Sequence, residues 1–134
     1  MKQVTRETFN MTIETKDLGN AGEEIAEEYL IRGGYAVLDR NYRTKIGEID
    51  IIAQKNGIIC FVEVKTGTPK STVYFLPEFH VDHRKFSKLK KLGELYLLER
   101  DLNKIDQKWR IDVISVIFDE YGNHKINHFE NVIL

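Results

Sequence analysis

Residues 47–65, GEIDIIAQKNGIICFVEVK, have the sequence pattern of a β-hairpin. Asn56-Gly57 in the middle is a strong hairpin signal, because both central positions of a tight hairpin turn require a positive φ. Runs rich in Ile, Val and Phe flank this dipeptide on both sides. The stretch therefore predicts two antiparallel strands joined by a two-residue turn, with Lys55 paired to Ile58.

The register of this hairpin sets Asp50 opposite Glu63, and Glu48 opposite Lys65. Because successive side chains of a strand point to opposite faces, Lys65 projects from the same face as Glu63. We expect the other face to be wholly apolar, with two facing rows formed by Ile49, Ile51 and Ala53 and by Val64, Val62 and Cys60.

The expected pair of Asp50 and Glu63 is unfavourable without a counter-charge. Like charges directly opposite on neighbouring strands destabilise a sheet. At an effective dielectric constant of about 20, their repulsion amounts to about 3–4 kcal/mol. A divalent cation between the carboxylates turns this repulsion into attraction, and hard oxygen ligands suit Mg²⁺ or Mn²⁺.

These residues resemble the catalytic signature of the restriction-endonuclease-like nucleases, an Asp followed at a distance by Glu-x-Lys. The whole chain is similar to the YraN-like family of uncharacterised bacterial proteins, which has that fold and is related to archaeal Holliday junction resolvases. The matching segments span roughly residues 19–132 and are Gly22-Glu23, Tyr29-Leu30, Gly34-Tyr35, Arg40-Asn41, Gly47-Glu48-Ile49-Asp50, Phe61-Val62-Glu63-Val64-Lys65, Asp112-Val113-Ile114 and His128.

The resemblance implies a catalytic site formed by Asp50, Glu63, Lys65 and Glu23, in which Asp50 and Glu63 hold Mg²⁺ or Mn²⁺. Lys65 would orient the attacking water or stabilise charge on the phosphate. Glu23, carried by the first helix, would hold a second metal or a water. The alternative for Glu23 is a favourable charge near a helix N-terminus. Glu48 is expected to pair with Lys65.

The resemblance also implies the fold: a single-domain three-layer α/β/α structure with a mixed β-sheet, over residues 19–134. The polar and irregular residues 1–18 are expected to form a flexible arm. Hydrophobic periodicity and turn signals predict the elements in chain order. They are a helix from Asn20 or Ala21 to Arg32, a strand over 35–43, the hairpin, a helix over 83–100, and strands over 109–118 and 125–129. A helical crossover between two neighbouring strands of one sheet makes them parallel.

Basic residues that could contact phosphate are predicted at the first strand and on the second long helix: Arg40, Arg43, Arg84, Lys85, Lys88 and Lys91. Positive charges in the first half of a helix oppose its dipole, which favours another use such as phosphate contact. A merely solvated helix face is the alternative. Gly67 stands where family members often have an Arg, so one phosphate contact of the family is not expected in this chain.

Residues 66–82 are predicted to form a loop that contains Tyr74-Phe75-Leu76. So long a loop in a compact domain is often functional. Its aromatic side chains could stack on bases or pack against the core. The four histidines show no metal-ligand spacing. Asp112, within an apolar run, needs a partner if buried, and Arg110 on the same strand face is the candidate. This pair, His128 and Asn131 are interpreted as structural.

The composition bounds the remaining possibilities. The 134 residues suit one domain, and the net charge of −1 gives no overall nucleic-acid signal, so any such signal must be local. No stretch approaches the roughly 20 apolar residues of a membrane span. The single Cys60 excludes an intrachain disulfide and agrees with a cytoplasmic location.

The leading hypothesis is a metal-dependent endonuclease or resolvase that hydrolyses phosphodiester bonds in nucleic acid, with DNA ahead of RNA. Two alternatives from other classes stay open. One is a non-catalytic nucleic-acid-binding module on the same fold, and the other is a protein-interaction adaptor that uses the loop over 66–82. The oligomeric state is open too, with a homodimer possible because resolvases of this fold act as dimers on two-fold junctions.

Overall fold

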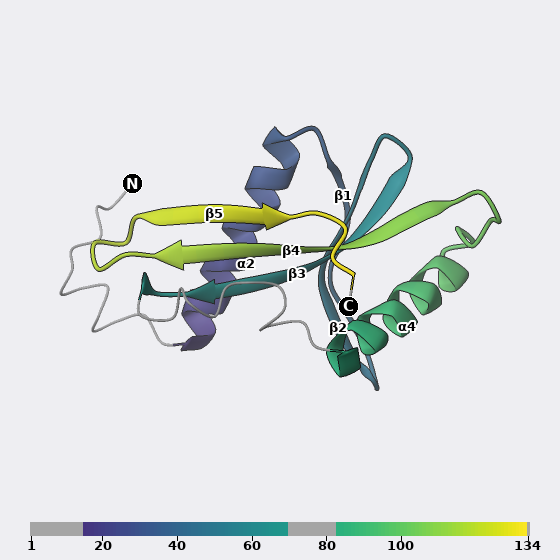
Figure 1. The fold of residues 1–134 in the computed structure, drawn as a ribbon, viewed down its shortest axis with the longest axis horizontal. Helices are drawn as coiled ribbons and strands as arrows, with labels where there is room; N and C mark the ends of the chain where they lie inside the picture. The colour runs from purple at the N-terminus through teal and green to yellow at the C-terminus, as the bar shows by residue number, and fades with distance from the viewer. Residues whose placement is uncertain (1–14, 70–82, 134) are drawn as a thin grey trace.

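The computed structural model describes residues 15–69 and 83–133. In chain order the elements are α2 (Thr15–Arg32), β1 (Ala36–Thr44), β2 (Gly47–Lys55), β3 (Ile58–Gly67), α4 (His83–Glu99), β4 (Lys108–Phe118) and β5 (His124–Phe129). The strands of these residues form one five-stranded sheet in the order β1-β2-β3-β4-β5 (Figure 1). The β3–β4 pair is parallel and the other three pairs are antiparallel, so the sheet is mixed.

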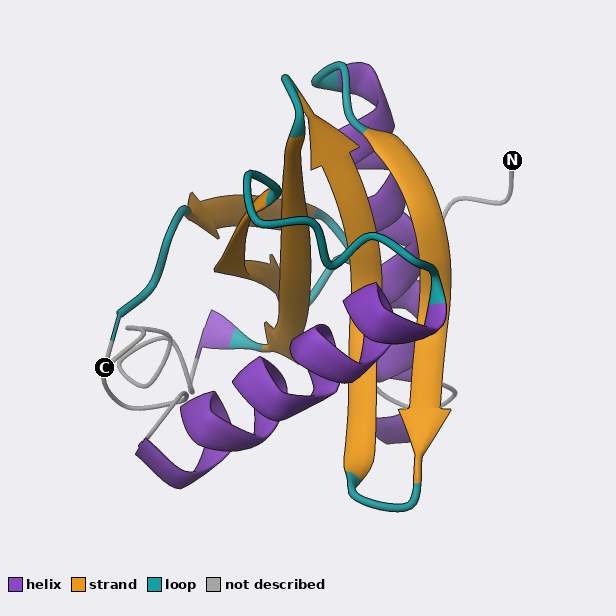
Figure 2. Ribbon diagram, turned by 90° about the vertical axis from the view of Figure 1, so that its right-hand side faces the viewer, coloured by secondary structure: helices purple, strands orange, loops and turns teal. Residues whose placement is uncertain are grey.

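The two helices lie on opposite faces of the sheet, which gives three layers (Figure 2). The α4 face is built by residues of α4 and of the strands, among them Leu89, Leu92, Tyr96, Ile52, Phe61 and Val113. The α2 face is built by another set that includes Ala26, Leu30, Ile51, Val62, Ile114 and Val116. The expectation of a single α/β domain with a mixed sheet is therefore confirmed.

The hairpin forms with the predicted turn. Lys55 pairs with Ile58, and the turn residues Asn56 and Gly57 adopt φ angles of 52° and 76°. The ladder between β2 and β3 runs as far as the pair Ile51–Val62. It thus ends one position before the expected pair of Asp50 and Glu63, at the edge of the site described below.

The prediction that Ile49 shares a face with Ile51 is wrong. Ile49 packs in the core on the α4 face, whereas Ile51 packs on the α2 face. Between these two residues, Asn41 of the neighbouring strand adopts a left-handed φ of 52°. This departure from extended backbone lies across from Asp50, at the position where the alternation of β2 changes face.

Some element boundaries differ from the predicted ones. The first helix begins at Thr15, so Asn20 lies inside it and is not its N-cap. The last four residues of the predicted arm over 1–18 belong to this helix, and the others lie outside the described residues. The segment Tyr74-Phe75-Leu76 and His80 also lie outside the described residues.

Two glycines let both helices approach β3 closely. A Cβ added at Gly22 of α2 would clash with Cγ2 of Thr66, and one added at Gly93 of α4 would lie 2.5 Å from the ring of Phe61. Such contacts leave no room for a side chain at either position. The close packing at Gly22 sets the neighbouring Glu23 beside the end of β3.

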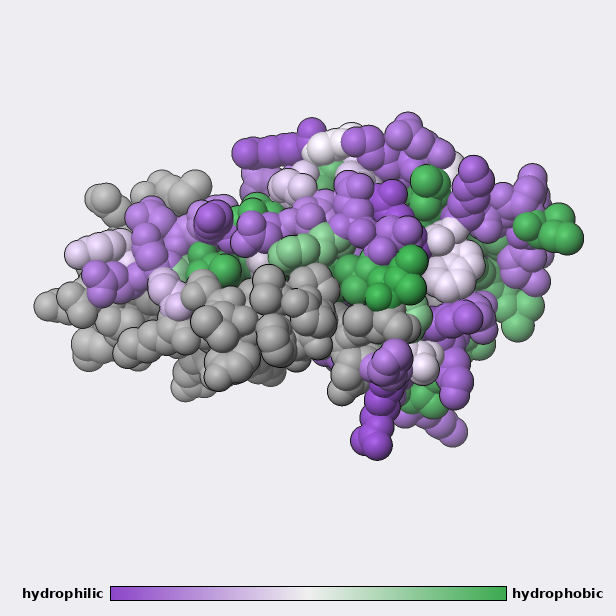
Figure 3. Space-filling model, in the orientation of Figure 1, coloured by the Kyte–Doolittle hydropathy of each residue, from purple (hydrophilic) through white to green (hydrophobic). Residues whose placement is uncertain are grey.

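The surface in Figure 3 is mainly polar, with apolar residues that stand singly rather than in one large patch. The exposed large apolar residues are Ile31, Leu38, Ile46, Leu98, Ile105, Tyr121 and Ile133. Scattered exposure of this kind is ordinary for a folded domain. Within residues 15–69 and 83–133, neither helix combines the length and the apolar character needed to cross a membrane.

Candidate active site

Two carboxylates meet where the β2–β3 ladder ends. Glu63 of β3 is buried, with 8% of its surface exposed. Asp50 of β2 accepts a hydrogen bond from the backbone N–H of Val64 through Oδ2, at 2.8 Å. The Asp50 side chain therefore satisfies a backbone donor of β3 just beyond the last pair of the ladder, which fixes this carboxylate against the strand that carries Glu63.

The surroundings of Asp50 disfavour its charged form. Burial, followed by the negative charge of Glu63, raises the pKa of Asp50 to about 7. The N–H of Val64 acts in the opposite direction, and the charges of Glu23 and Glu48 add smaller increases. The repulsion expected between Asp50 and Glu63 is thus present, and a proton or a cation relieves it.

Two ammonium groups bind the same oxygen of Glu63. Lys65 Nζ lies 3.2 Å from Oε1 of Glu63, and Lys85 Nζ lies 2.6 Å from it. Burial, and then the neighbouring ammonium of Lys85, lower the pKa of Lys65. Burial by itself would lower the pKa of Lys85 as well, but the charge of Glu63 outweighs it and the pKa is raised. Glu63 is therefore charge-compensated from the sheet and from α4.

The sequence did not predict that Lys85 would form an ion pair with Glu63. It predicted Lys85 as a phosphate contact, whereas the structure brings it to the carboxylates. The available signal was the basic start of the second helix, where positive charge opposes the helix dipole and needs a partner.

Glu23 reaches toward the carboxylates from α2. Burial, more than any neighbouring charge, raises its pKa, and both Glu48 and Glu63 contribute to the increase. Its Oε1 atom is buried and accepts no hydrogen bond. A buried carboxylate oxygen without a donor is costly. Glu23 thus supplies an oxygen that is ready to accept a hydrogen bond from a water or to face a cation.

The donor set fits a single hard divalent cation. Across the part of the chain that the structure describes, no three His, Cys, Asp or Glu side chains form a ready-made metal cluster. Asp50 and Glu63 nevertheless offer carboxylate oxygens that repel each other, and Glu23 has an unsatisfied oxygen nearby. Mg²⁺ in proteins is commonly bound by one or two carboxylates, with waters and substrate phosphate completing its shell.

The predicted partner of Glu48 is wrong. Glu48 lies opposite Arg43 of β1, and its Oε2 accepts a hydrogen bond from Arg43 Nε at 2.8 Å. The reason is that β1 runs beside this end of β2. Arg40 is half-buried and lies 3.7 Å from Glu27 of α2. Both arginines predicted for phosphate contact are thus next to carboxylates, while Arg84, Lys88 and Lys91 of α4 are exposed.

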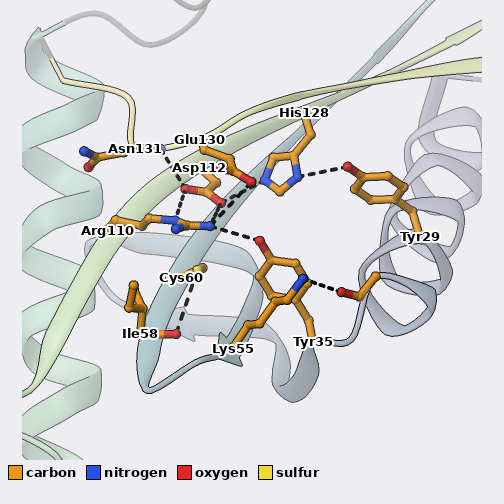
Figure 4. Close-up of polar contacts among 11 residues, drawn as sticks. Tyr29, Tyr35, Lys55, Ile58, Cys60, Arg110, Asp112, His128, Glu130 and Asn131 are labelled. Carbon is orange, nitrogen blue, oxygen red and sulfur yellow. Dashed lines mark hydrogen bonds and ion pairs between the residues drawn. The ribbon is translucent and has the colours of Figure 1, made fainter.

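A separate polar cluster is buried beside α2 (Figure 4). Asp112 is fully buried and accepts hydrogen bonds from Arg110 Nε at 3.0 Å and from the backbone N–H of Asn131 at 2.9 Å. A further hydrogen bond of 2.8 Å joins it to His128 Nε2. Burial by itself would raise the pKa of Asp112, but these hydrogen bonds, with that of His128 the largest, hold it below its usual value. The predicted pairing of Arg110 with Asp112 is confirmed.

Two tyrosines complete this cluster. A hydrogen bond of 3.1 Å joins Tyr29 of α2 to His128 Nδ1, and Arg110 donates to the hydroxyl of Tyr35 at 2.9 Å. Burial raises the pKa of both tyrosines, which opposes any role as a nucleophile. The cluster therefore ties α2, β4 and β5 together, as its interpretation as structural requires.

A shallow hollow of about 460 Å³ lies at the start of β3, beside Ile58. It is lined by Ile58, Gln107, Lys108, Trp109, Arg110 and Asn131. Its lining contains neither Asp50 nor Glu63, so it is separate from the carboxylate site.

Comparisons with known proteins point to one bacterial family. The sequence profile of the uncharacterised protein family UPF0102 matches residues 22–116. A UPF0102 protein of Persephonella marina is 43% identical over 113 residues, which cover 84% of this chain and 90% of that protein. One of Clostridium kluyveri is 44% identical over 108 residues, 81% of this chain and 85% of the relative. One of Desulforamulus reducens is 40% identical over 126 residues, 92% of this chain and 100% of the relative.

Proposed function

The chain belongs to the uncharacterised protein family UPF0102, and we propose, from the geometry of its carboxylate site, that this protein is a metal-dependent endonuclease or resolvase that hydrolyses phosphodiester bonds in nucleic acid. The membership confirms the resemblance to the YraN-like family. Family and fold do not by themselves assign a reaction, so the proposal rests on the site.

One observation supports it above all: Asp50 and Glu63, from adjacent strands, stand together at the end of a ladder with Lys65 on Glu63. A sheet that only needed stability would not place two carboxylates side by side in a half-buried position. A site for a divalent cation on a phosphate ester does need them there.

Each side chain of the site has a separate role in the proposed reaction. Asp50 and Glu63 would hold Mg²⁺ or Mn²⁺, with the carbonyl oxygen of Val64 as a further ligand. The bound ion supplies Lewis-acid chemistry, which makes water more acidic and stabilises negative charge on the phosphate. Lys65 would orient the attacking water or donate to a phosphate oxygen. The free oxygen of Glu23 would accept a hydrogen bond from that water and set its direction.

The substrate is proposed to be nucleic acid, with DNA ahead of RNA because the family is related to junction resolvases. Arg84, Lys88 and Lys91 are exposed along α4, the helix whose Lys85 reaches Glu63. Since the net charge of the chain is only −1, this local basic surface is the part suited to phosphate contact. Exposed lysine and arginine near a site of this kind steer and position a polyanion without reading its sequence.

A second candidate function is a non-catalytic nucleic-acid-binding module. The observation that favours it is the charge compensation of Glu63 by Lys65 and Lys85, which balances that carboxylate without any metal. Salt-dependent retention on branched or single-stranded DNA would separate such a module from a protein-interaction adaptor, because only the module releases counterions when it binds.

The proposal is tested by a cleavage panel of a four-way junction, a flap, single-stranded DNA and RNA, each with Mg²⁺ or Mn²⁺. The wild type is expected to cut at least one of these substrates, and both chelator and Asp50→Ala should abolish the cut. A matched control is Asp106→Ala, which removes an exposed carboxylate in the turn before β4 and should leave cleavage unchanged. Cleavage that survives in Asp50→Ala, or that is absent throughout the panel, contradicts the proposal.

A further inference from the structure

The two lysines that contact Glu63 come from different elements and differ in how exposed their side chains are. Lys65 comes from β3 itself, and 23% of its side chain is exposed. Lys85 comes from the first turn of α4, on the other layer, and 36% of its side chain is exposed. Lys85 also makes the shorter contact, at 2.6 Å against 3.2 Å. The more exposed and more closely bound ammonium is therefore the one that does not belong to the sheet.

Oε1 of Glu63 already contacts two ammonium groups, which leaves no room on it for a divalent ion as well. A Mg²⁺ ion lies about 2.0–2.1 Å from its ligand oxygens. An ammonium that stays within hydrogen-bond distance of the same oxygen would then face a divalent charge at close range, where like charges repel strongly. At least one of the two ammonium groups must therefore leave this oxygen when a divalent ion binds it.

Lys85 is the group that can leave. It stands near the N-terminus of α4, where a positive charge opposes the helix dipole, and its pairing with Glu63 counteracts that unfavourable placement. Its long flexible stem and partial exposure allow the ammonium to swing toward solvent. Lys65 is less exposed and is tied to the strand that also carries Glu63.

We propose that Lys85 is a place-holder for the metal: it occupies the cation position on Glu63 and is displaced when the divalent ion binds. The released ammonium then lies at the entrance of the site, beside the exposed basic residues of α4, where it can contact the substrate phosphate. This inference rests on the proposed function. It also unites the phosphate contact predicted for Lys85 with the ion pair observed on Glu63, as two successive states of one side chain.

The test is calorimetric titration with Mn²⁺ of the wild type, Lys85→Gln and a control, Lys90→Gln. Because no ammonium has to be displaced, Lys85→Gln should bind Mn²⁺ about tenfold more tightly than the wild type, which corresponds to about 1.4 kcal/mol. Lys90 is exposed on the same helix, so Lys90→Gln removes the same charge elsewhere and should change the affinity by less than about twofold. Without metal, Lys85→Gln should melt at a lower temperature than the wild type.

A second variant separates displacement from simple repulsion and covers a failure of Lys85→Gln to fold. Lys85→Arg keeps the positive charge but binds a carboxylate through two parallel hydrogen bonds. It should therefore bind Mn²⁺ more weakly than the wild type. Equal or tighter binding by Lys85→Arg, or unchanged or weaker binding by Lys85→Gln, overturns the place-holder while the metal site stands. Absence of Mn²⁺ binding by the wild type overturns the metal site and the place-holder together.

Discussion

Replacing Asp50 by Asn should stabilise the metal-free protein in alkaline solution. In the wild type, burial and the charge of Glu63 raise the pKa of Asp50 from 3.8 to about 7. As the pH rises, the unfolded chain releases this proton at about pH 4, while the folded chain keeps it until about pH 7. Across that interval the unfolded state binds fewer protons, so the free energy of unfolding falls as the pH rises.

The size of this effect follows from the same pKa. At about 1.4 kcal/mol for each unit of pKa, the full difference corresponds to about 4 kcal/mol as an upper bound. Asp50 is half-buried rather than fully enclosed, and solvent screening reduces the repulsion, so about 2 kcal/mol is the expected loss. Asn has nearly the same shape and can still accept the hydrogen bond from Val64, but it has no proton to release.

Urea unfolding in chelator, at about pH 5 and about pH 8, measures this. The advantage of Asp50→Asn over the wild type should grow by about 1 kcal/mol between the two conditions, because part of the loss already occurs between about pH 4 and about pH 5. Asp106→Asn, in an exposed turn, should follow the wild type at both. Millimolar Mn²⁺ should raise the melting temperature of the wild type but not of Asp50→Asn, because a ligand of the native state stabilises it by mass action. A mutant that is less stable than the wild type at the higher pH would refute the reasoning, since Asp50 would then be held by a favourable ion pair.

Three further outcomes are expected. Gly22→Ala should destabilise the protein by about 1–3 kcal/mol in thermal unfolding, because its added Cβ clashes with Thr66. Gly19→Ala is the control: its added Cβ has nothing within 4 Å, so it should stabilise α2 by about 0.5–1 kcal/mol. Asp112→Asn should cost about 3–5 kcal/mol in urea unfolding, since it removes the closer of the two ion pairs of the half-buried Arg110 guanidinium; a loss below about 1 kcal/mol would refute the structural role of the cluster. Neutralising the exposed basic residues of α4 should weaken binding to all DNA sequences alike. The slope of the logarithm of the binding constant against the logarithm of the salt concentration should become shallower by about one for each phosphate that the variant no longer neutralises. An unchanged slope would mean that this face is merely solvated. The residues to change to Gln are Arg84, Lys88 and Lys91.

The hairpin could be predicted because its signals are local. Asn56-Gly57 meets the demand of the turn for positive φ at two successive positions, and the pairing of Lys55 with Ile58 follows from that turn. The parallel pairing of β3 with β4 followed from the helix between them. These features depend on the order and spacing of residues, which the sequence contains.

The start of α2 and the face of Ile49 could not be predicted in the same way. Thr15 precedes Asn20, which reads as a helix cap, and tertiary packing overrides that local preference. Ile49 follows the alternation expected of a strand in the sequence, but in the fold the alternation changes face between Ile49 and Ile51, across from the left-handed Asn41 of the neighbouring strand. That interruption depends on a contact between strands and has no signal within 47–65.

The residues of the candidate site could be predicted from the sequence, but the ion pair between Glu63 and Lys85 could not. Asp50, Glu63 and Lys65 were expected from the hairpin pattern and from the resemblance to nucleases, while the ion pair of Glu63 with Lys85 depends on how α4 packs on the sheet. Gly93 lets that helix approach Phe61 closely, and Lys85 in its first turn contacts Glu63. The distance between the helix layer and the sheet cannot be inferred from the spacing of residues along the chain.

The claim that Asp50 and Glu63 together hold a divalent cation is tested most directly by the stoichiometry of Mn²⁺ binding, measured by electron paramagnetic resonance. The wild type is expected to bind one Mn²⁺ per chain, and both Asp50→Ala and Glu63→Ala should lose it. Asp106→Ala should bind as the wild type does. A wild type that leaves all Mn²⁺ free in solution, or carboxylate variants that bind it undiminished, would contradict the claim.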